Sequence, residues 1–242
     1  MATVGDLVAR ERRSNQTAFE SPTTTYDYRQ FCTLAHKTGN YMSYFGARIE
    51  SEISVFTGNS MSAAPVLTLF GGSLLGATVA FNPAEYRAPR VVVAPAERIE
   101  TGLVPETPGM SIIAFDGDVD EPSVHSFGRG TWSENPACPQ DPRISSETKL
   151  IRDGESTYTH GEIVRVAKSL AADYEISTSD RVVLRTPISS VASIICGIVM
   201  PIMVGAAIVY ADPDLECAAG SVAIGDGDSP EPITIEPTTI SK

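Results

Sequence analysis

The sequence predicts an α/β protein made of two similar βαβ-type lobes, each with a mainly parallel sheet. The first observation is an internal repeat, because residues 16–83 resemble residues 147–213. Three segment pairs carry the likeness: TYDY with TYTH (25–28 and 157–160), 51–56 with 179–184, and 76–81 with 205–210. The copies are longer than the roughly 20–50 residues of a solenoid unit, so each copy is expected to be a lobe.

The second observation is that each copy opens with a predicted hairpin and a capped helix. Asp153-Gly154 is a tight-turn dipeptide between two short β-prone runs, and Pro22 divides the matching runs of the first copy. A helix start is predicted at Asp27, with Gln30 three residues on, and at Thr159, with Glu162 in the same place. Apolar residues then recur with helical spacing in both copies (Phe31, Leu34, Ala35, Met42 and Phe45; Ile163, Val166, Ala167, Leu170, Ala171 and Tyr174).

The third observation is the order of the remaining elements. A short apolar strand, an uncharged helix (61–75 or 189–204), a glycine (Gly76 or Gly205) and a β-branched strand follow in each copy. Further strands are predicted at 91–95 and 110–115, with a shorter echo at 221–225 and 232–237. Strands that alternate with helices in this way are typical of a parallel sheet covered on both faces.

The chain is therefore divided into a first lobe (1–115), a polar segment (116–146) and a second lobe (147–242). The middle segment contains four prolines and is predicted to be a linker or long surface loop. Its DGDVDE run resembles a calcium loop, but the sixth position is Glu121 and the twelfth is Phe127, so the EF-hand pattern fails.

Composition excludes several classes of function. The net charge of −12 argues against a nucleic-acid partner, because no basic stripe is present to meet phosphates. Only four of the 18 basic residues are lysines, and this acidic, lysine-poor balance predicts a halophilic protein, whose self-repulsion salt would screen. The four cysteines form no CxxC pair and no metal-ligand spacing, so we expect free thiols in a cytoplasmic protein and no metal site.

Two uncharged runs, 61–84 and 186–211, are long enough to span a bilayer of about 30 Å. Each contains a helix break, Gly76 in one and Pro201 in the other, and neither has a basic flank. We therefore expect a buried helix followed by a buried strand in each run, and no membrane insertion. The first fourteen residues lack the apolar run of a signal peptide and are predicted to form a short helix with Val4, Leu7 and Val8 inward.

The order of these motifs resembles the AMP-binding adenylate-forming superfamily, which includes the acyl-CoA synthetases. The segments TYDYRQF, NSMSAAPVL and GATVAFNP are similar to its "tYtyaeL", "Nsp" and "GAv.vplnp" elements, and STYTHGEIV through GAAIVY resembles its next subdomain. The resemblance covers two blocks and implies the fold of the first half of the family's large domain, which is itself built from two similar subdomains.

The resemblance also implies a phosphate loop, and the sequence departs from the family there. The family holds ATP phosphates in a Ser/Thr/Gly-rich loop just before the "TH" helix, where glycines let backbone N–H groups converge on an anion. Here ETKLIRDGESTYTH has one glycine, and its carboxylates Glu147, Asp153 and Glu155 would repel pyrophosphate. The family's adenine-binding element and its C-terminal lysine have no counterpart in this sequence.

No catalytic constellation is apparent, since no nucleophile–base pair and no P-loop or GxSxG motif is present. Any ligand cleft is expected at the carboxyl ends of the parallel strands, where Thr57, Asn59, Thr186, Ser189 and Ser190 lie. Two functions stay open. One is an acyl-CoA-synthetase-like pseudoenzyme that associates with a protein partner, either a ligase or a second copy. The other is one half of a split acid–CoA ligase that uses ATP and magnesium.

Overall fold

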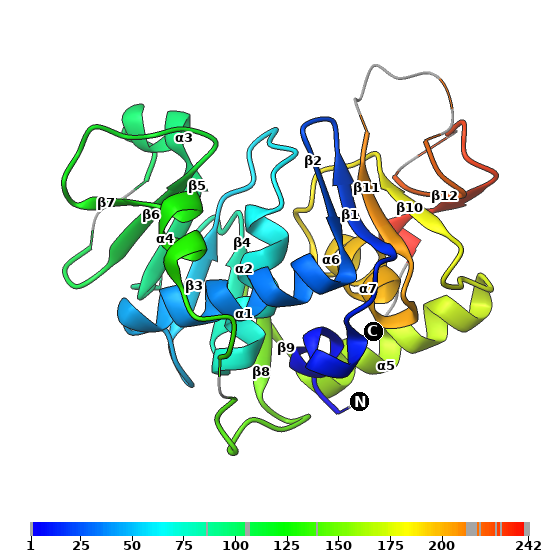
Figure 1. The fold of residues 1–242 in the computed structure, drawn as a ribbon, viewed down its shortest axis with the longest axis horizontal. Coiled ribbons are helices and arrows are strands. Elements are labelled where there is room, and N and C mark those ends of the chain that lie inside the picture. The colour runs from blue at the N-terminus through cyan, green and yellow to red at the C-terminus, as the bar shows by residue number, and fades with distance from the viewer. Residues whose placement is uncertain are drawn as a thin grey trace.

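The computed structural model describes residues 2–85, 87–104, 107–138, 140–211, 217, 219–225, 227 and 229–239. Pro213, which closes the second sequence copy, lies outside these residues. Two sheets divide the strands, with the seven-stranded sheet in the left half of Figure 1 and the six-stranded sheet in the right half. All strand pairs are parallel except the two hairpins, so the predicted α/β class is confirmed.

The seven-stranded sheet is built around the first sequence copy. Its order is β7 (Val124–Ser126), β6 (Ser111–Phe115), β5 (Val91–Pro95), β3 (Glu52–Val55), β4 (Thr78–Phe81), β8 (Lys149–Asp153) and β9 (Ser156–Thr159). The strands of its centre are buried on both faces, which explains why they are runs of β-branched residues with little alternation.

The six-stranded sheet is built around the second copy. Its order is β13 (Ile233–Ile235), β12 (Val222–Ile224), β10 (Arg181–Leu184), β11 (Ala207–Tyr210), β1 (Thr17–Ser21) and β2 (Thr24–Asp27). The strands predicted at 221–225 and 232–237 are therefore confirmed.

The two copies exchange their hairpins. The hairpin β1–β2 of the first copy pairs with β11 of the second, Phe19 opposite Ile208. The hairpin β8–β9 of the second copy pairs with β4 of the first, Val79 opposite Ile151. The contiguous lobes 1–115 and 147–242 therefore do not match the sheets strand for strand, since each sheet takes its last two strands from the other copy. Local hairpin signals could not reveal this, because a hairpin's turn says nothing of which distant strand its outer edge will meet.

The sheet register also corrects the repeat alignment by one residue. Glu52 pairs with Thr78 and Arg181 pairs with Ala207, while Thr78 and Ala207 are themselves matched in sequence. Glu52 therefore corresponds to Arg181, and not to Asp180 as the sequence alignment has it.

Both predicted capping boxes form. The Asp27 carboxylate accepts from the Gln30 N–H at 2.7 Å at the start of α1 (Tyr28–Tyr44). The Thr159 hydroxyl accepts from the Glu162 N–H at 3.3 Å at the start of α5 (His160–Asp173). In both, the side chain three residues on returns a bond to the cap backbone, and the apolar stripe behind it is buried.

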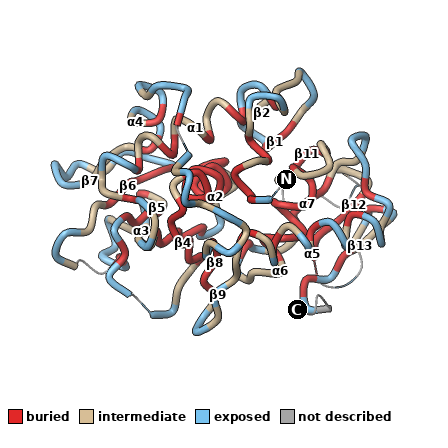
Figure 2. Tube along the Cα trace, turned by 90° about the horizontal axis from the view of Figure 1, so that it is seen from below, coloured by how far each residue is buried: buried red, intermediate tan, exposed pale blue. Residues whose placement is uncertain are grey.

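The uncharged helices lie between the sheets. Helix α2 (Ala64–Leu75) is buried along nearly its whole length, as Figure 2 shows at the centre of the molecule. Its counterpart is α6 (Val191–Ile194), a π-helical turn η3 (Ile195–Val199) and α7 (Met200–Val204) in succession. Each run ends at a left-handed glycine, Gly76 or Gly205, as predicted.

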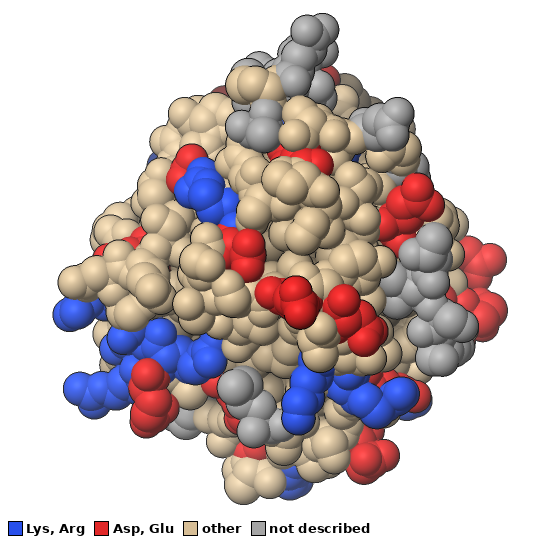
Figure 3. All heavy atoms as spheres, turned by 90° about the vertical axis from the view of Figure 1, so that its right-hand side faces the viewer, with Lys and Arg blue, Asp and Glu red and all other residues tan. Residues whose placement is uncertain are grey.

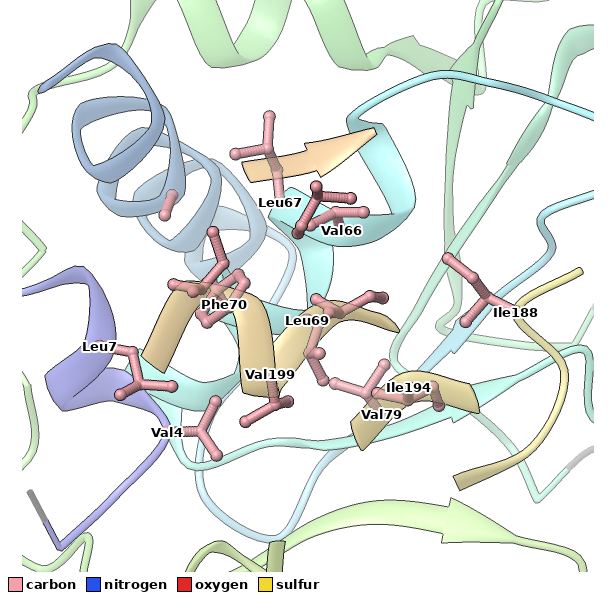
Figure 4. Close-up of a cluster of buried hydrophobic side chains, with 14 of the residues drawn as sticks. Val4, Leu7, Val66, Leu67, Leu69, Phe70, Val79, Ile188, Ile194 and Val199 are labelled. Atoms are coloured by element: carbon pink, nitrogen blue, oxygen red, sulfur yellow. The ribbon is translucent and has the colours of Figure 1, made fainter. Parts of the chain in front are cut away.

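One core joins both halves. Figure 4 shows Leu69 and Phe70 of α2 with Val199 of η3 and with Val4 and Leu7 from the N-terminal segment. The N-terminal segment forms two short 3-10 helices, η1 (Gly5–Val8) and η2 (Arg10–Arg12), and Val4, Leu7 and Val8 are buried as expected.

The polar segment 116–146 is only partly a loop. It contains β7, which extends the first sheet beside β6, and α4 (Phe127–Ser133), which packs on α1. The sequence analysis expected a linker or long surface loop, and residues 124–133 differ from that expectation. They contain two glycines and no apolar period, so no local pattern indicated a strand or a helix. The remaining helix is α3 (Ala96–Glu100), and η4 (Pro237–Thr239) follows β13.

No helix among the described residues has the length and apolar character needed to cross a membrane.

Candidate functional site

The predicted cleft residues lie where the two halves meet. The Thr57 N–H, just past β3, donates to Asn82 Oδ1 at 3.0 Å, and Asn82 Nδ2 donates to Thr57 Oγ1 at 2.9 Å. Asn82 also donates to the Ile188 carbonyl at 3.1 Å, inside the 186–190 loop. The structure therefore brings Thr57 close to that loop, through a side chain that the sequence-based prediction did not name.

Asn82 is the residue that sequence reasoning missed at this point. Its φ of 42° is in the left-handed region, which asparagine adopts more readily than most residues. An asparagine followed by proline at the end of a predicted strand was the available signal. The Asn82 side chain hydrogen-bonds to both the backbone N–H and the hydroxyl of Thr57. The polar groups of Thr57 therefore join β3 to the end of β4.

Of the other predicted residues, some hydrogen-bond at the start of α6 and some lie on the surface. Ser190 begins α6, where its hydroxyl and the Ser193 N–H bond at 3.1 Å, and the Ser189 N–H donates to Ser193 Oγ at 3.2 Å. Asn59 and Ser189 are exposed, and Thr186 is half-buried. Any ligand role for the five residues remains a prediction.

The start of α6 holds one of the protein's own carboxylates. Asp153 ends β8 and accepts from the Val191 N–H at 3.0 Å through Oδ2. A helix start with free N–H groups attracts anions, so this carboxylate occupies a position that a phosphate would favour.

The hairpin around Asp153 has only two turn residues, Gly154 and Glu155, between β8 and β9. Gly154 has φ 56°, which a tight turn requires and which glycine adopts without strain. Glu155 forms an ion pair with Arg87, and Arg152 forms one with Glu52. Both arginines near the turn are therefore paired with carboxylates of the chain.

The histidines have structural roles. His160 Nδ1 accepts from the Val4 N–H at 3.1 Å, and burial lowers the pKa of His160 from 6.5 to about 4. His36 accepts from the Cys138 N–H at 3.2 Å and approaches the Val8 carbonyl at 3.2 Å, and burial also lowers its pKa. His125 stacks beside Phe45, with ring centroids 4.4 Å apart.

The cysteines and the charged groups do not indicate a site either. Cys32, Cys138, Cys196 and Cys217 are free, and burial raises the pKa of Cys32 and Cys138 to about 11 and of Cys196 to about 12. Within the described part of the chain, no three His, Cys, Asp or Glu side chains are grouped to hold a metal. Figure 3 shows basic groups separated by acidic and uncharged ones on the face it presents.

Comparison with solved structures identifies the fold. An anthranilate CoA ligase superposes with a TM-score of 0.77 at 17% identity, covering 92% of this chain and 49% of its own. The N-terminal domain of FACL13 from Mycobacterium tuberculosis gives 0.72 at 17%, with 93% and 63% covered. A benzoate CoA ligase from Burkholderia xenovorans gives 0.73 at 18%, with 93% and 50% covered.

The chain has the fold of the N-terminal part of a CoA ligase. It spans about half the length of the anthranilate and benzoate CoA ligases and 63% of the FACL13 N-terminal domain. No protein-family model matches the sequence, and no curated protein does. The expected resemblance to the first half of an adenylate-forming enzyme is thus confirmed at the level of fold.

Proposed function

We propose that this chain is an acyl-CoA-synthetase-like pseudoenzyme that does not adenylate a substrate on its own and acts by binding a protein partner. The observation that carries the proposal is the β8–β9 turn. Adenylation requires donors that converge on phosphate oxygens. Here the place that the resemblance gives to those donors holds a two-residue turn, with Asp153 on the Val191 N–H and Glu155 beside Arg87.

The turn disfavours phosphate for a further reason. The nearby guanidinium of Arg152 bonds both oxygens of Glu52 at 2.7 Å, so using it for ATP would leave a largely buried carboxylate without its partner. Losing one partner of a buried pair costs about 3–5 kcal/mol. The turn is acidic and its two nearby arginines are already paired with carboxylates. This supports binding to a protein partner over binding and reaction of ATP.

The partner we expect is a full-length ligase or a second copy of this chain. The free cysteines fit a reducing compartment, and we place the protein in the cytoplasm.

A second candidate is one half of a split acid–CoA ligase. The observation that favours it is the coverage, since the chain matches 49% of the anthranilate CoA ligase. In this candidate a second chain supplies the remaining part of the ligase. This candidate requires Mg-ATP to bind despite the acidic turn.

A thermal melt in molar KCl, with and without Mg-ATP, separates the two. A ligand at one hundred times its dissociation constant adds about 2.7 kcal/mol, which is roughly 5–11 °C for a chain of this size. We expect no shift beyond that of magnesium chloride alone. A shift of that size would contradict the pseudoenzyme proposal and favour the split ligase. If no shift occurs, co-purification from the native cell identifies the partner.

A further inference from the structure

A cavity separate from the β8–β9 turn opens between the β1–β2 hairpin of the six-stranded sheet and the seven-stranded sheet. Its volume is about 660 Å³, within the roughly 300–1,000 Å³ of small-molecule sites. Its walls are the β1–β2 turn, the first turn of α2, the carboxyl end of β6, and α4. It therefore lies at the end of parallel strands, where α/β sheets bind ligands.

One buried polar group at this cavity has no partner. Thr131 of α4 lines the cavity and is 3% exposed, and its hydroxyl makes no hydrogen bond among the described residues. Leaving such a hydroxyl unsatisfied costs about 1–3 kcal/mol, and native proteins rarely do so. A bound molecule with a hydrogen-bond donor or acceptor would satisfy it, because a hydroxyl can both accept and donate.

The charge at this cavity is negative. Asp116, just past β6, lines it and is exposed, and the Ser60 hydroxyl donates to its carboxylate. Among the described residues that line the cavity, none is Lys, Arg or His. Asp116 has φ 56°, a left-handed conformation uncommon outside glycine, and such residues cluster at functional sites.

The second acidic residue contributes less. Asp118 also lines the cavity, but Arg129 pairs with it at 2.6 Å and neutralises it locally. The first turn of α2 carries only the partial positive charge of a helix start, and Ser62 Oγ already accepts from the Ala64 N–H at 3.3 Å. Among the described residues, Asp116 is therefore the acidic group of the lining that has no cation paired with it, while Lys37, beside Trp132, donates to the Trp132 carbonyl at 2.7 Å.

Aromatic side chains complete the walls. Tyr26, Phe115 and Phe127 line the cavity with Trp132, which is 75% exposed. The Trp132 ring already has an ammonium group against it, with Lys37 Nζ 5.5 Å from the ring centroid. Ammonium ions bind aromatic faces and carboxylates together, and a neutral or anionic ligand gains neither attraction.

We propose that this cavity binds a small organic ammonium ion, held by Asp116, donating to Thr131 and packed against the aromatic walls. The site excludes carboxylates and phosphates. It is thus a different site from the one expected for an adenylating enzyme, and it stands whether or not the chain binds ATP.

The test uses three probes that share one ring: benzylammonium, benzyl alcohol and benzoate, at fixed ionic strength. Trp132 is the only tryptophan, so its fluorescence reports on this cavity. We expect saturable binding of benzylammonium, binding of benzyl alcohol at least about tenfold weaker, and none of benzoate. Equal binding of the three, tighter binding of benzoate, or no saturable change up to about 10 mM benzylammonium overturns the proposal.

Variants locate the effect. Asp116→Asn should weaken benzylammonium about tenfold and leave benzyl alcohol unchanged, and asparagine tolerates the same left-handed conformation. Thr131→Val should weaken the binding of benzylammonium severalfold, because it removes the hydroxyl and keeps the shape of the side chain. A cooperative melt of this variant shows that it is folded. Asp120→Asn is the matched control, because it removes a charge from the same loop at a residue outside the cavity lining. A loss in Asp120→Asn equal to that in Asp116→Asn would show a general charge effect and overturn the site.

Discussion

Arg152 donates to both carboxylate oxygens of Glu52 at 2.7 Å, and so joins the hairpin of the second repeat to β3 of the first repeat within the seven-stranded sheet. The equivalent positions in the six-stranded sheet hold the same pair with the charges exchanged. There Glu20 of the first hairpin accepts from Arg181 of β10, at 2.8 and 3.1 Å. Each ion pair joins an exchanged hairpin to the sheet that receives it. The acidic residue lies on the hairpin in one sheet and on the neighbouring repeat's strand in the other.

The first prediction follows from the difference in burial between these pairs. The side chains of Arg152 and Glu52 are 6% and 14% exposed, while those of Arg181 and Glu20 are 38% and 36% exposed. We expect Arg152→Glu to lower the free energy of unfolding by about 3–5 kcal/mol, because it leaves Glu52 buried against a like charge. The control Arg181→Glu should cost about 1 kcal/mol or less.

The double variant Glu52→Arg/Arg152→Glu should recover at least half of that loss, because it reproduces the order found at Glu20 and Arg181. Urea unfolding at pH 7 measures all three. A double variant no more stable than Arg152→Glu would show that the charge order matters and that the two pairs are not equivalent.

Local signals explain which parts of the fold the sequence could predict. Asp27 with Gln30 and Thr159 with Glu162 lie three residues apart, so their contacts depend on the helix alone. The pairing of Phe19 with Ile208 joins residues far apart in the chain, and no turn or period encodes it. Strand β7 and helix α4 were missed for the same reason, because they become ordered only against β6 and α1.

The candidate site also divides into features with a local signal and features that depend on long-range contacts. The rule that ligands meet the carboxyl ends of parallel strands named Thr57 together with the 186–190 loop, and a ligand role for them stays a prediction. The residue that connects them, Asn82, is a long-range contact and was not predicted. The hydrogen bond from the Val191 N–H to Asp153 could not be predicted from the sequence either. It depends on where α6 begins relative to a hairpin of the other sheet.

The hairpin exchange predicts how the chain behaves when it is cut. Fragments 1–140 and 141–242 each lack two strands that complete their own sheet, since β8–β9 and β1–β2 belong to the partner fragment's sequence. We expect a site-specific cut after residue 140 to leave a folded complex that elutes as one species. Expressed separately, each fragment should aggregate, because an unpaired strand edge is exposed, β4 in one and β11 in the other.

Mixing the refolded fragments should restore the complex. Separate fragments that elute as folded monomers with cooperative melts would contradict the exchange as a stabilising feature, and would support two independent lobes at the boundaries first expected.

The packing of α1 on α2 predicts a size limit at Gly71. A Cβ there would lie 2.8 Å from the Gly39 backbone nitrogen and 2.8 Å from the Met42 side chain. We expect Gly71→Ala to destabilise the protein by about 1–3 kcal/mol, because backbone cannot move aside as a flexible side chain can. The control is Gly128→Ala in α4, where nothing lies within 4 Å of the added carbon and helix propensity should give a gain of up to about 1 kcal/mol. Equal melting temperatures for the two variants would contradict this packing argument.

The acidic composition predicts that salt stabilises the protein. With a net charge of −12, self-repulsion opposes the folded state and is screened as salt rises. We expect the melting temperature to increase from 0.1 M to about 2 M KCl, and the increase to saturate once the Debye length falls to about 3 Å. A melting temperature that is unchanged or falls over this range would remove the case for a halophilic protein.

His160 predicts a loss of stability in mild acid. Its folded pKa is lowered by burial from 6.5 to about 4, so between these values the unfolded chain binds a proton that the folded chain does not. This contribution is fully present above pH 6.5 and is lost as the pH falls towards 4, by roughly 3 kcal/mol in total. His36, whose pKa burial also lowers, adds a change of the same sign.

His160→Asn separates the two histidines, because asparagine can still accept from the Val4 N–H but does not titrate. We expect the variant to be less stable than the parent at pH 7.5 and to lose less stability between pH 6.5 and 4. Urea unfolding at several pH values measures both. Depressed carboxyl groups such as Asp180 and Glu231 are present in both parent and variant, so their loss near pH 4 cancels in the difference between the two profiles. Parallel pH profiles for parent and variant would show that His160 is not protected from protonation and that the N-terminal segment does not seal it.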